Sequence, residues 1–349
     1  MVEKAEWGII GAGGIGSEVM RQLNQDYVSD RLHMGPLPEF VVRSTGIMGP
    51  DAVTPLDFES FQDVPIPEVT FVAIPSSDDG FEAHEYISHI LQNGGIAVTA
   101  EKGAISNYFS ELKEESDNFN NLGINATVGG GTRLLEVAKH YCQDIDNITQ
   151  IHLAVNGTLA AIMSSVGPRE GSGMSLGQAV HQAVELGYAE PGSTNPNEVI
   201  RGEAESDIPK KTAIFFNALG LSDESLDWNE LKFNLSDEDI DHAAEEAKVR
   251  RFIVSLYSPN YLEKSQKCPE DQIIGGFEFE HAGWKLVGGF RHIDRNPLFS
   301  ALASTTGPSN GMVIGLGPNE TDGVYSLVGP GAGVRQTANT MIDDYLSKR

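Results

Sequence analysis

Cysteine is scarce in this sequence. Its 349 residues include two cysteines, Cys142 and Cys268, and neither lies in a C-x-x-C or His-rich spacing that would hold a metal ion. His84 and His89 are five residues apart, so they do not share a helix face, and the other histidines are scattered. We therefore predict no metal site. Sparse cysteine is typical of a reducing compartment, so we expect the protein in the cytoplasm.

Long hydrophobic runs are also missing. No stretch approaches the roughly 18 apolar residues of a membrane-spanning helix. Residues 1–7 carry charges rather than the apolar run of a signal peptide. The sequence therefore predicts neither a membrane span nor a secretion signal.

Basic residues are few as well. There are 24 Lys plus Arg against 50 Asp plus Glu, which gives a formal net charge of −26. This surplus repels phosphate backbones and anionic membranes, and no cluster of Lys and Arg offsets it, so we expect neither nucleic acid nor a membrane as partner. We interpret the acidity as a solvated, salt-adapted surface, with a binding face for a cationic partner as the alternative.

The chain begins with a strand, a glycine turn and a helix. Apolar residues 7–10 run into Gly11-Ala12-Gly13-Gly14-Ile15-Gly16, and helical residues follow to position 23. In a dinucleotide-binding turn, Gly11 allows the tight bend, Gly13 lets the backbone approach a pyrophosphate, and Gly16 lets helix and strand pack closely. Ile15 belongs to the same turn, at the helix N-terminus where the anion binds. The alternative is a purely structural glycine turn.

A second apolar run, residues 40–42, ends in Arg43-Ser44-Thr45 rather than in an acidic residue. An acidic side chain here would accept from the ribose 2′-hydroxyl of NAD, whereas a cation beside small hydroxyls suits the 2′-phosphate of NADP. Arg43 therefore favours NADP, with NAD as the alternative if Arg43 is only a surface arginine.

Further short apolar strands alternate with helices. Residues 69–74 and 95–99 read as strands, residues 84–92 between them as a helix, and residues 125–128 as another strand. This alternation predicts an α/β fold with a parallel, doubly wound sheet, whose ligands bind at the carboxyl ends of its strands. Three candidate cofactor-binding residues fall at such ends: Ser76, Thr99 and Lys102.

The pattern changes after about residue 135. The sequence predicts helices, strands of antiparallel type and a polar loop. The helices cover residues 134–143, 178–186, 209–218 and 236–248, the strands 148–155, 252–256, 273–279 and 284–290, and the loop 195–207. The chain closes with a glycine turn, residues 329–333, that enters a helix over residues 337–346. A second helix N-terminus of this kind can also face an anion.

Taken together, these pieces resemble the homoserine dehydrogenase family. They occur in family order over nearly the whole chain. The matching segments are Gly11 to Gly16, Val98-Thr99-Ala100-Glu101-Lys102, Val128-Gly129-Gly130-Gly131, Asn156-Gly157-Thr158, Gly187-Tyr188-Ala189-Glu190-Pro191, Asp207 with Lys211, Asn296-Pro297-Leu298, and Gly329 to Thr337.

The resemblance implies an architecture and an activity. It implies an N-terminal Rossmann domain over residues 1–133, an α+β substrate-binding and dimerisation domain with a mixed sheet over 134–325, and a C-terminal helix over 326–349 that returns to the Rossmann domain. The family reduces L-aspartate 4-semialdehyde to L-homoserine with NAD(P)H, in threonine and methionine biosynthesis. Family members are implied to be homodimers, and they often hold a monovalent cation.

The resemblance also assigns roles to individual residues. It gives proton transfer to Lys211 and places Lys102 beside both nicotinamide and substrate. Glu190 and Asp207 would bind the small-molecule substrate, with Thr158 against it. Gly187 and Gly333 would contact the cofactor.

Elementary chemistry supports these residue types. Hydride delivery to an aldehyde leaves an alkoxide, which a cationic acid must stabilise and protonate. A lysine suits this role when burial or a second cation lowers its pKa, and Lys102 is the candidate second cation. The positively charged amino group of the substrate would pair with a carboxylate, such as that of Glu190 or Asp207. Asp207 and Lys211 are four residues apart on one helix face, but Asp207 could also be a helix cap within a surface salt bridge, and Lys210 is an adjacent competitor.

Three departures from the family pattern concern the substrate pocket. Glu101 replaces the usual Asn, Leu159-Ala160-Ala161 replaces polar and aromatic residues, and the stretch 192–205 is longer than usual.

The chain ends at Arg349 without room for a regulatory domain, so we expect no threonine feedback through one. Two other functions remain as alternatives: a dehydrogenase of the glucose–fructose oxidoreductase type, and a non-catalytic NADP-sensing protein.

Overall fold

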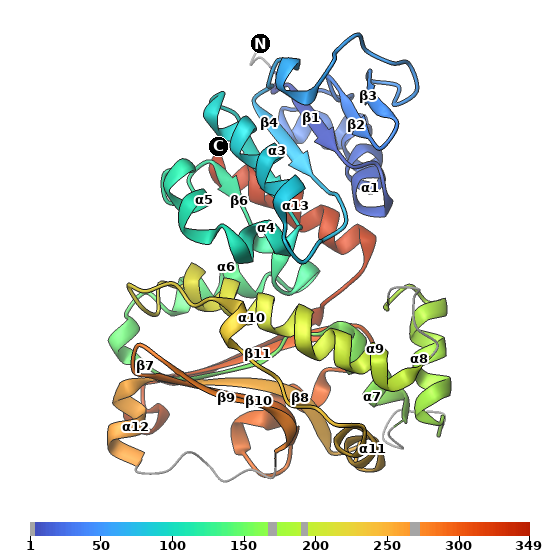
Figure 1. The fold of residues 1–349 in the computed structure, drawn as a ribbon. Coiled ribbons are helices and arrows are strands. Elements are labelled where there is room, and N and C mark those ends of the chain that lie inside the picture. Colours follow the sequence, from blue (N-terminus) through green and yellow to red (C-terminus); the bar gives the residue numbers. More distant parts are fainter. Residues whose placement is uncertain (1–3, 167–172, 190–194, 266–272) are drawn as a thin grey trace. The chain divides into compact units, whose positions relative to one another are not determined.

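A computed structural model describes residues 4–166, 173–189, 195–265 and 273–349 of the protein (Figure 1). The chain forms two compact units. The first combines residues 1–131 with the C-terminal residues 334–349, and the second comprises residues 132–333. Each unit has its own six-stranded sheet.

The sheet of the first unit has the strand order β3-β2-β1-β4-β5-β6. All neighbouring strands are parallel except β3, which pairs antiparallel with β2 in a hairpin. This arrangement is the predicted doubly wound sheet. The strands are β1 (Trp7–Ile10), β2 (Val41–Arg43), β3 (Gly46–Met48), β4 (Val69–Val72), β5 (Ile96–Thr99) and β6 (Leu122–Gly123).

The C-terminal helix α13 (Val334–Lys348) is part of this first unit and packs on α1 and on the strands β5 and β6. Tyr345 on α13 is fully buried and donates a hydrogen bond from its hydroxyl to Glu68 at 2.6 Å. The predicted fold class, with a helix that returns to the Rossmann domain, is therefore confirmed. The other helices of the unit are α1 (Gly14–Leu23), α2 (Asp26–Leu32), α3 (Phe81–Gln92), α4 (Lys102–Asn107) and α5 (Phe109–Glu115).

One predicted strand is wrong. Residues 125–128 do not continue the sheet, because Asn125–Thr127 forms a 3-10 turn. Its backbone is held by α13: the Asp344 carboxylate accepts from the Asn125 backbone N–H at 2.7 Å. A contact with a residue so distant in the sequence outweighs the local strand pattern.

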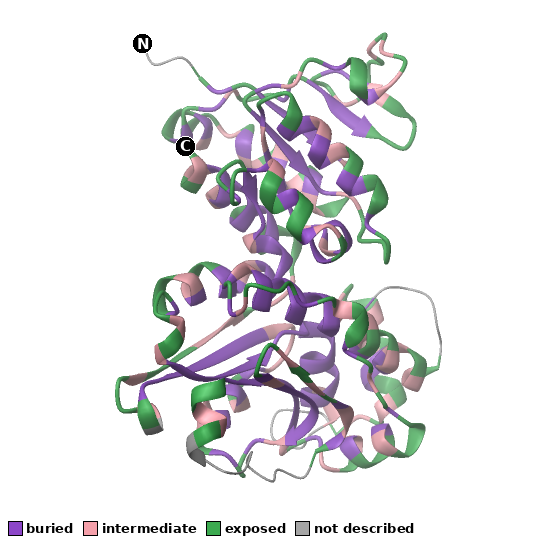
Figure 2. Cartoon of the chain, turned by 60° about the vertical axis from the view of Figure 1, so that its left-hand side comes forward, coloured by how far each residue is buried: buried purple, intermediate pink, exposed green. Residues whose placement is uncertain are grey.

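The sheet of the second unit has the order β12-β11-β7-β8-β10-β9. Every neighbouring pair is antiparallel, so the expected mixed sheet is wrong for the described strands. Strands β7 and β8 are buried along their whole length (Figure 2). The strands are β7 (Ile148–Ala154), β8 (Arg250–Tyr257), β9 (Ile274–His281), β10 (Trp284–His292), β11 (Ser309–Leu316) and β12 (Gly323–Pro330).

Helices cover this antiparallel sheet. Helix α7 follows directly after β7 and is buried over most of its length. The helices and turns of the unit are α6 (Leu134–Tyr141), α7 (Gly157–Val166), α8 (Leu176–Glu185), α9 (Pro196–Gly202), a π-helical segment η5 (Glu203–Asp207), α10 (Ile208–Ala218), α11 (Asp237–Glu245), α12 (Pro259–Ser265) and the 3-10 segment η7 (Pro297–Ser304).

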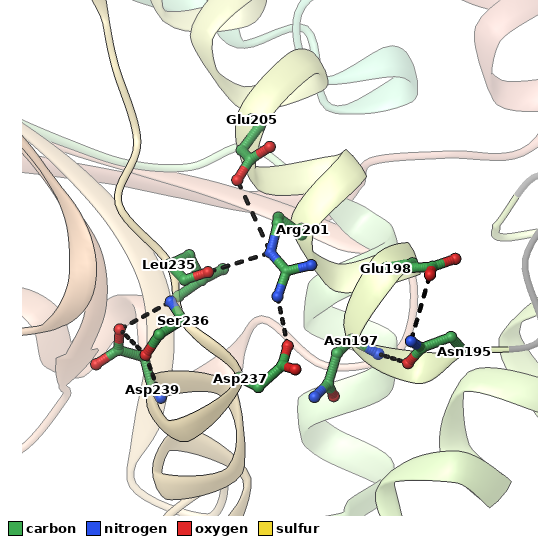
Figure 3. Close-up of polar contacts among 9 residues, drawn as sticks. All are labelled: Asn195, Asn197, Glu198, Arg201, Glu205, Leu235, Ser236, Asp237 and Asp239. Atoms are coloured by element: carbon green, nitrogen blue, oxygen red, sulfur yellow. Dashed lines mark hydrogen bonds and ion pairs between the residues drawn. The ribbon is translucent and has the colours of Figure 1, made fainter.

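The predicted polar loop over 195–207 is also wrong, because α9, η5 and α10 follow one another without a break from Pro196 to Ala218. Asn195 caps α9 by accepting from the Asn197 N–H at 3.1 Å. Arg201 then ties α9 to the start of α11 (Figure 3). Its guanidinium donates to the Leu235 carbonyl at 3.1 Å and forms an ion pair with Asp237. These contacts stabilise a helix that the polar composition does not predict.

In the described part of the chain, no helix combines the length and the apolar character that crossing a membrane requires.

Candidate active site

The glycine turn of the first unit lies between β1 and α1. Gly11 has a φ of +92°, and a Cβ there would lie 2.5 Å from the Ala73 carbonyl oxygen. A Cβ on Gly16 would lie 1.8 Å from the Gly11 carbonyl oxygen. Both positions therefore require glycine for the fold itself. Ile15 packs its side chain against the core of this unit.

Gly13 differs from the other two glycines. A Cβ at this position would meet no atom within 4 Å, and its φ of −72° suits any residue. The fold therefore does not need a glycine here. Gly13 is the N-cap of α1, where backbone N–H groups and the helix dipole favour an anion. Open space at a helix N-terminus fits a bound pyrophosphate.

Arg43 is the last residue of β2 and is exposed. It pairs with Gly46 at the end of the β2–β3 hairpin. β2 runs parallel to its neighbour β1, so Arg43 at the end of β2 lies at the same edge of the sheet as the glycine turn, which follows β1. At this edge the sequence analysis predicts the adenosine ribose, and the contact with Arg43 stays a prediction.

The ends of β4 and β5 carry the other predicted cofactor residues. The Ser76 hydroxyl accepts from the Lys102 backbone N–H at 3.2 Å, so the two strand ends are joined. The Thr99 hydroxyl donates to the Val72 carbonyl at 3.1 Å and accepts from the Glu101 N–H at 3.0 Å. Thr99 thus has a structural role here, and its contact with a cofactor stays a prediction.

The structure explains the unusual Glu101. Its side chain is buried and caps the short helix α4, accepting from the N–H groups of Gly103 at 2.8 Å and Ala104 at 2.6 Å. The Ser77 N–H donates to the same carboxylate at 3.2 Å. Glu101 therefore fixes the segment that carries Lys102. Lys102 belongs to the first unit, so its role as the second cation beside Lys211 stays a prediction.

Asp207 and Lys211 meet in the second unit. The Lys211 ammonium lies 2.7 Å from the Asp207 carboxylate and donates to the Val155 carbonyl at 2.8 Å. The side chains are 11% and 17% exposed, which excludes an ordinary surface salt bridge. Asp207 has helical backbone angles and no capping hydrogen bond, so the cap alternative is wrong.

Lys210 points to different partners. It is buried, its ammonium donates to the Ser206 hydroxyl at 3.0 Å, and it lies over the Trp228 ring at 4.7 Å. Lys211, rather than Lys210, shares the carboxylate of Asp207.

Two residues that the sequence did not single out complete this group. The Asn156 amide donates to Asp207 at 2.8 Å and to Glu203 at 2.6 Å. In the sequence, Asn156 stands out only as part of the Asn156-Gly157-Thr158 segment, and Glu203 lies within the predicted loop. Had that loop been read as a helix, the spacing of four residues between Glu203 and Asp207 would have placed them on one face.

Thr158 and Gly187 lie in the same unit. Thr158 is in the first turn of α7, and its hydroxyl donates to the Tyr188 carbonyl at 2.5 Å. Gly187 has a φ of +71° just after α8. Glu190, the predicted substrate-binding acid that follows Tyr188, lies outside the described residues. Gly333, with a φ of +125°, precedes α13.

The Lys211 site can donate a proton to an oxygen. Among the described residues, the ammonium of Lys211 has two acceptors, Asp207 and the Val155 carbonyl. An ammonium carries three N–H donors, so one is left for a ligand oxygen. A lysine that can donate a proton and a dinucleotide-type glycine turn, one on each unit, are features typical of oxidoreductases that act on a carbonyl or hydroxyl group.

A family model described as homoserine dehydrogenase matches residues 134–346, more than half of the chain. The chain belongs to the homoserine dehydrogenase family. The resemblance inferred from the sequence motifs is thereby confirmed.

Curated relatives of the homoserine dehydrogenase family match the chain at low identity. The NAD(+)-dependent homoserine dehydrogenase of Pseudomonas canavaninivorans is 26% identical over 294 residues, covering 80% of this chain and 69% of the relative. The homoserine dehydrogenase of Emericella nidulans is 24% identical over 245 residues, covering 63% of this chain. That match spans 64% of the Emericella protein, less than two thirds of its length.

Solved homoserine dehydrogenase structures share the fold. The enzyme of Thermoplasma acidophilum superposes with a TM-score of 0.71 at 17% identity, covering 99% of this chain and 98% of that one. A hyperthermophilic archaeal homoserine dehydrogenase in complex with NADPH gives a TM-score of 0.63 at 20% identity, covering 99% and 97%.

Proposed function

We propose that this protein interconverts L-aspartate 4-semialdehyde and L-homoserine with a nicotinamide cofactor. The observation that carries the proposal is the ammonium of Lys211, held by Asp207 and Val155 with one N–H remaining for a ligand oxygen. Membership of the homoserine dehydrogenase family supports the choice of substrate.

The first unit fits the cofactor. The open space beside Gly13 and the N-terminus of α1 would hold the pyrophosphate, and Arg43 would contact a 2′-phosphate. When bound, the nicotinamide supplies the hydride. NADP is the proposed cofactor because of Arg43, and two related structures contain NADPH. NAD is the alternative, because one relative is named as NAD(+)-dependent.

Side chains of the second unit transfer the proton and bind the substrate. Lys211 stabilises the alkoxide formed from the aldehyde and protonates it, and in the reverse direction it accepts the proton of the hydroxyl. Asp207 holds the Lys211 ammonium in place. Asp207 and Glu190 supply negative charge for the amino group of the substrate, and Thr158 lies against the substrate.

A substrate panel tests this proposal. We expect NADP⁺-linked oxidation of L-homoserine and negligible oxidation of other hydroxy acids and of sugars. Preferential oxidation of sugars would instead favour an enzyme of the glucose–fructose oxidoreductase type. Tight NADPH binding without turnover of any panel member would favour a sensing protein.

Arg43→Ala should weaken binding of NADPH more than binding of NADH. A charge-assisted hydrogen bond contributes roughly 1.5–3 kcal/mol, so we expect the Kd for NADPH to rise by at least about tenfold. The Kd for NADH should change little, because NADH lacks the 2′-phosphate. Fluorescence titration of both cofactors measures this, with Arg31→Ala as the control, an exposed arginine on α2. Equal losses for the two cofactors would reject Arg43 as the phosphate partner.

Four further features stay predictions, the first three from the family resemblance and the last from the scarcity of cysteine. They are the homodimer, the monovalent cation, the role in threonine and methionine biosynthesis, and the cytoplasmic location.

A further inference from the structure

The Asn156 amide joins two carboxylates of the second unit. Asn156 is buried, directly after β7 and before α7. Its Nδ2 donates to Glu203 Oε2 at 2.6 Å and to Asp207 Oδ2 at 2.8 Å. An amide NH₂ has two N–H donors, so these two carboxylates use both.

The orientation of this amide follows from its other end. Asn156 Oδ1 accepts from the Leu159 backbone N–H at 2.7 Å, in the first turn of α7. A backbone N–H requires an acceptor, so the oxygen faces Leu159 and the NH₂ group faces the carboxylates. The first turn of α7 thus fixes one end of the amide, and Glu203 and Asp207 hold the other.

One oxygen links this arrangement to the proposed acid. Asp207 Oδ2, which accepts from Asn156, is also the oxygen 2.7 Å from Lys211 Nζ. Both the Asn156 amide and the Lys211 ammonium therefore help to hold this oxygen in place. If the Asn156 amide rotates, Asp207 Oδ2 loses one of its donors. The carboxylate that holds the Lys211 ammonium is then less firmly positioned.

Glu203 and Asp207 are the first and last residues of the π-helical segment η5. Such segments are rare and occur often at functional sites. Arg201, just before η5, anchors α9 to α11 and also pairs with Glu205 at 4.0 Å (Figure 3). Glu205 thus points to Arg201, whereas Glu203 and Asp207 point to Asn156.

We infer that Glu203 is a positioning residue for the proposed reaction. It acts through Asn156: by accepting one amide N–H, it directs the other N–H to Asp207 and so keeps the Lys211 ammonium oriented. The inference rests on the proposed function, because the orientation of Lys211 matters only if Lys211 transfers the proton. It assigns a role to the unusually long segment before α10.

Replacement of Glu203 by Gln and by Met separates the hydrogen bond from the charge. Gln keeps an acceptor for Asn156, so kcat for L-homoserine oxidation should stay within about threefold of wild type. Met has a similar volume but no strong acceptor, so kcat should fall by about tenfold or more, since a small misplacement of a catalytic group is costly. KM for L-homoserine and Kd for NADPH should change by less than about threefold in both variants.

Glu205→Met is the matched control, because Glu205 lies on the same π segment and pairs with Arg201 rather than Asn156. It should retain kcat. An equal loss in Glu205→Met and Glu203→Met would mean that the segment as a whole is disturbed, which overturns the inference. If Glu203→Gln is impaired as strongly as Glu203→Met, with a raised KM for L-homoserine, then Glu203 binds the substrate through its charge, and the positioning role is wrong.

Hydrogen exchange provides a readout without turnover. The Leu159 N–H donates to Asn156 Oδ1, so its exchange rate reports whether the amide is held. We expect faster exchange at Leu159 in Glu203→Met and the wild-type rate in Glu203→Gln. An unchanged rate in Glu203→Met overturns the inference, even if wild-type protein does not oxidise L-homoserine. Absence of that oxidation in the wild type would instead contradict the proposed function.

Discussion

Lys211→Met is expected to lower kcat for L-homoserine oxidation by about 10²–10⁴-fold, the usual contribution of a positioned acid–base group. Met keeps most of the side-chain volume but cannot donate or accept the proton. The proposed cofactor-binding residues Gly13 and Arg43 belong to the other unit, so the Kd for NADPH should stay near the wild-type value. Stopped-flow kinetics and fluorescence titration measure the two quantities.

Lys210→Met is the control for that experiment. Lys210 is buried beside Ser206 and Trp228, and the ion pair with Asp207 is made by Lys211, so replacement of Lys210 should affect stability more than kcat. Near-normal turnover in Lys211→Met, or a larger loss of kcat in Lys210→Met, would assign the proton transfer to another group.

Gly13→Val is expected to weaken NADPH binding by roughly 100-fold or more without unfolding the protein. The side chain enters the open space at the N-terminus of α1, where no atom of the described structure lies within 4 Å of a Cβ. It would displace a pyrophosphate that accepts from backbone N–H groups, and two charge-assisted hydrogen bonds of roughly 1.5–3 kcal/mol each account for the loss.

Gly16→Ala provides the contrast. Its Cβ would lie 1.8 Å from the Gly11 carbonyl oxygen, so this smaller change should lower the melting temperature, whereas Gly13→Val should not. Calorimetry measures the melting temperatures of the two variants and so distinguishes a loss of stability from a loss of cofactor binding. If Gly13→Val binds NADPH as tightly as the wild type does, the cofactor site lies elsewhere.

The sequence predicted the parts of the site that obey local rules. The glycines at 11, 13 and 16 follow a fixed spacing between a strand and a helix, and Asp207 and Lys211 are one helical turn apart. Such features depend on backbone geometry over a few residues. The role of Glu101 was less predictable, because its three N–H donors include Ser77 from the end of another strand.

The π segment was missed for a physical reason. Residues 195–207 are polar and show no apolar periodicity, so they resemble a loop. Their helical form depends on Arg201, whose partners Leu235 and Asp237 come more than 30 residues later. Without that helix, Glu203 could not be placed beside Asn156. The strand predicted over 125–128 is wrong for the same reason, a contact with a residue distant in the sequence: Asp344, near the C-terminus, accepts from the Asn125 backbone N–H.

The proposed homoserine dehydrogenase activity is tested by the rate of NADP⁺-linked oxidation of L-homoserine by the full chain. It is measured beside Lys211→Met, under conditions where both proteins are shown to bind NADPH. We expect saturable turnover by the wild type and its near-complete loss in the variant. Absence of L-homoserine oxidation by a folded, NADPH-binding wild-type protein would contradict the proposed activity.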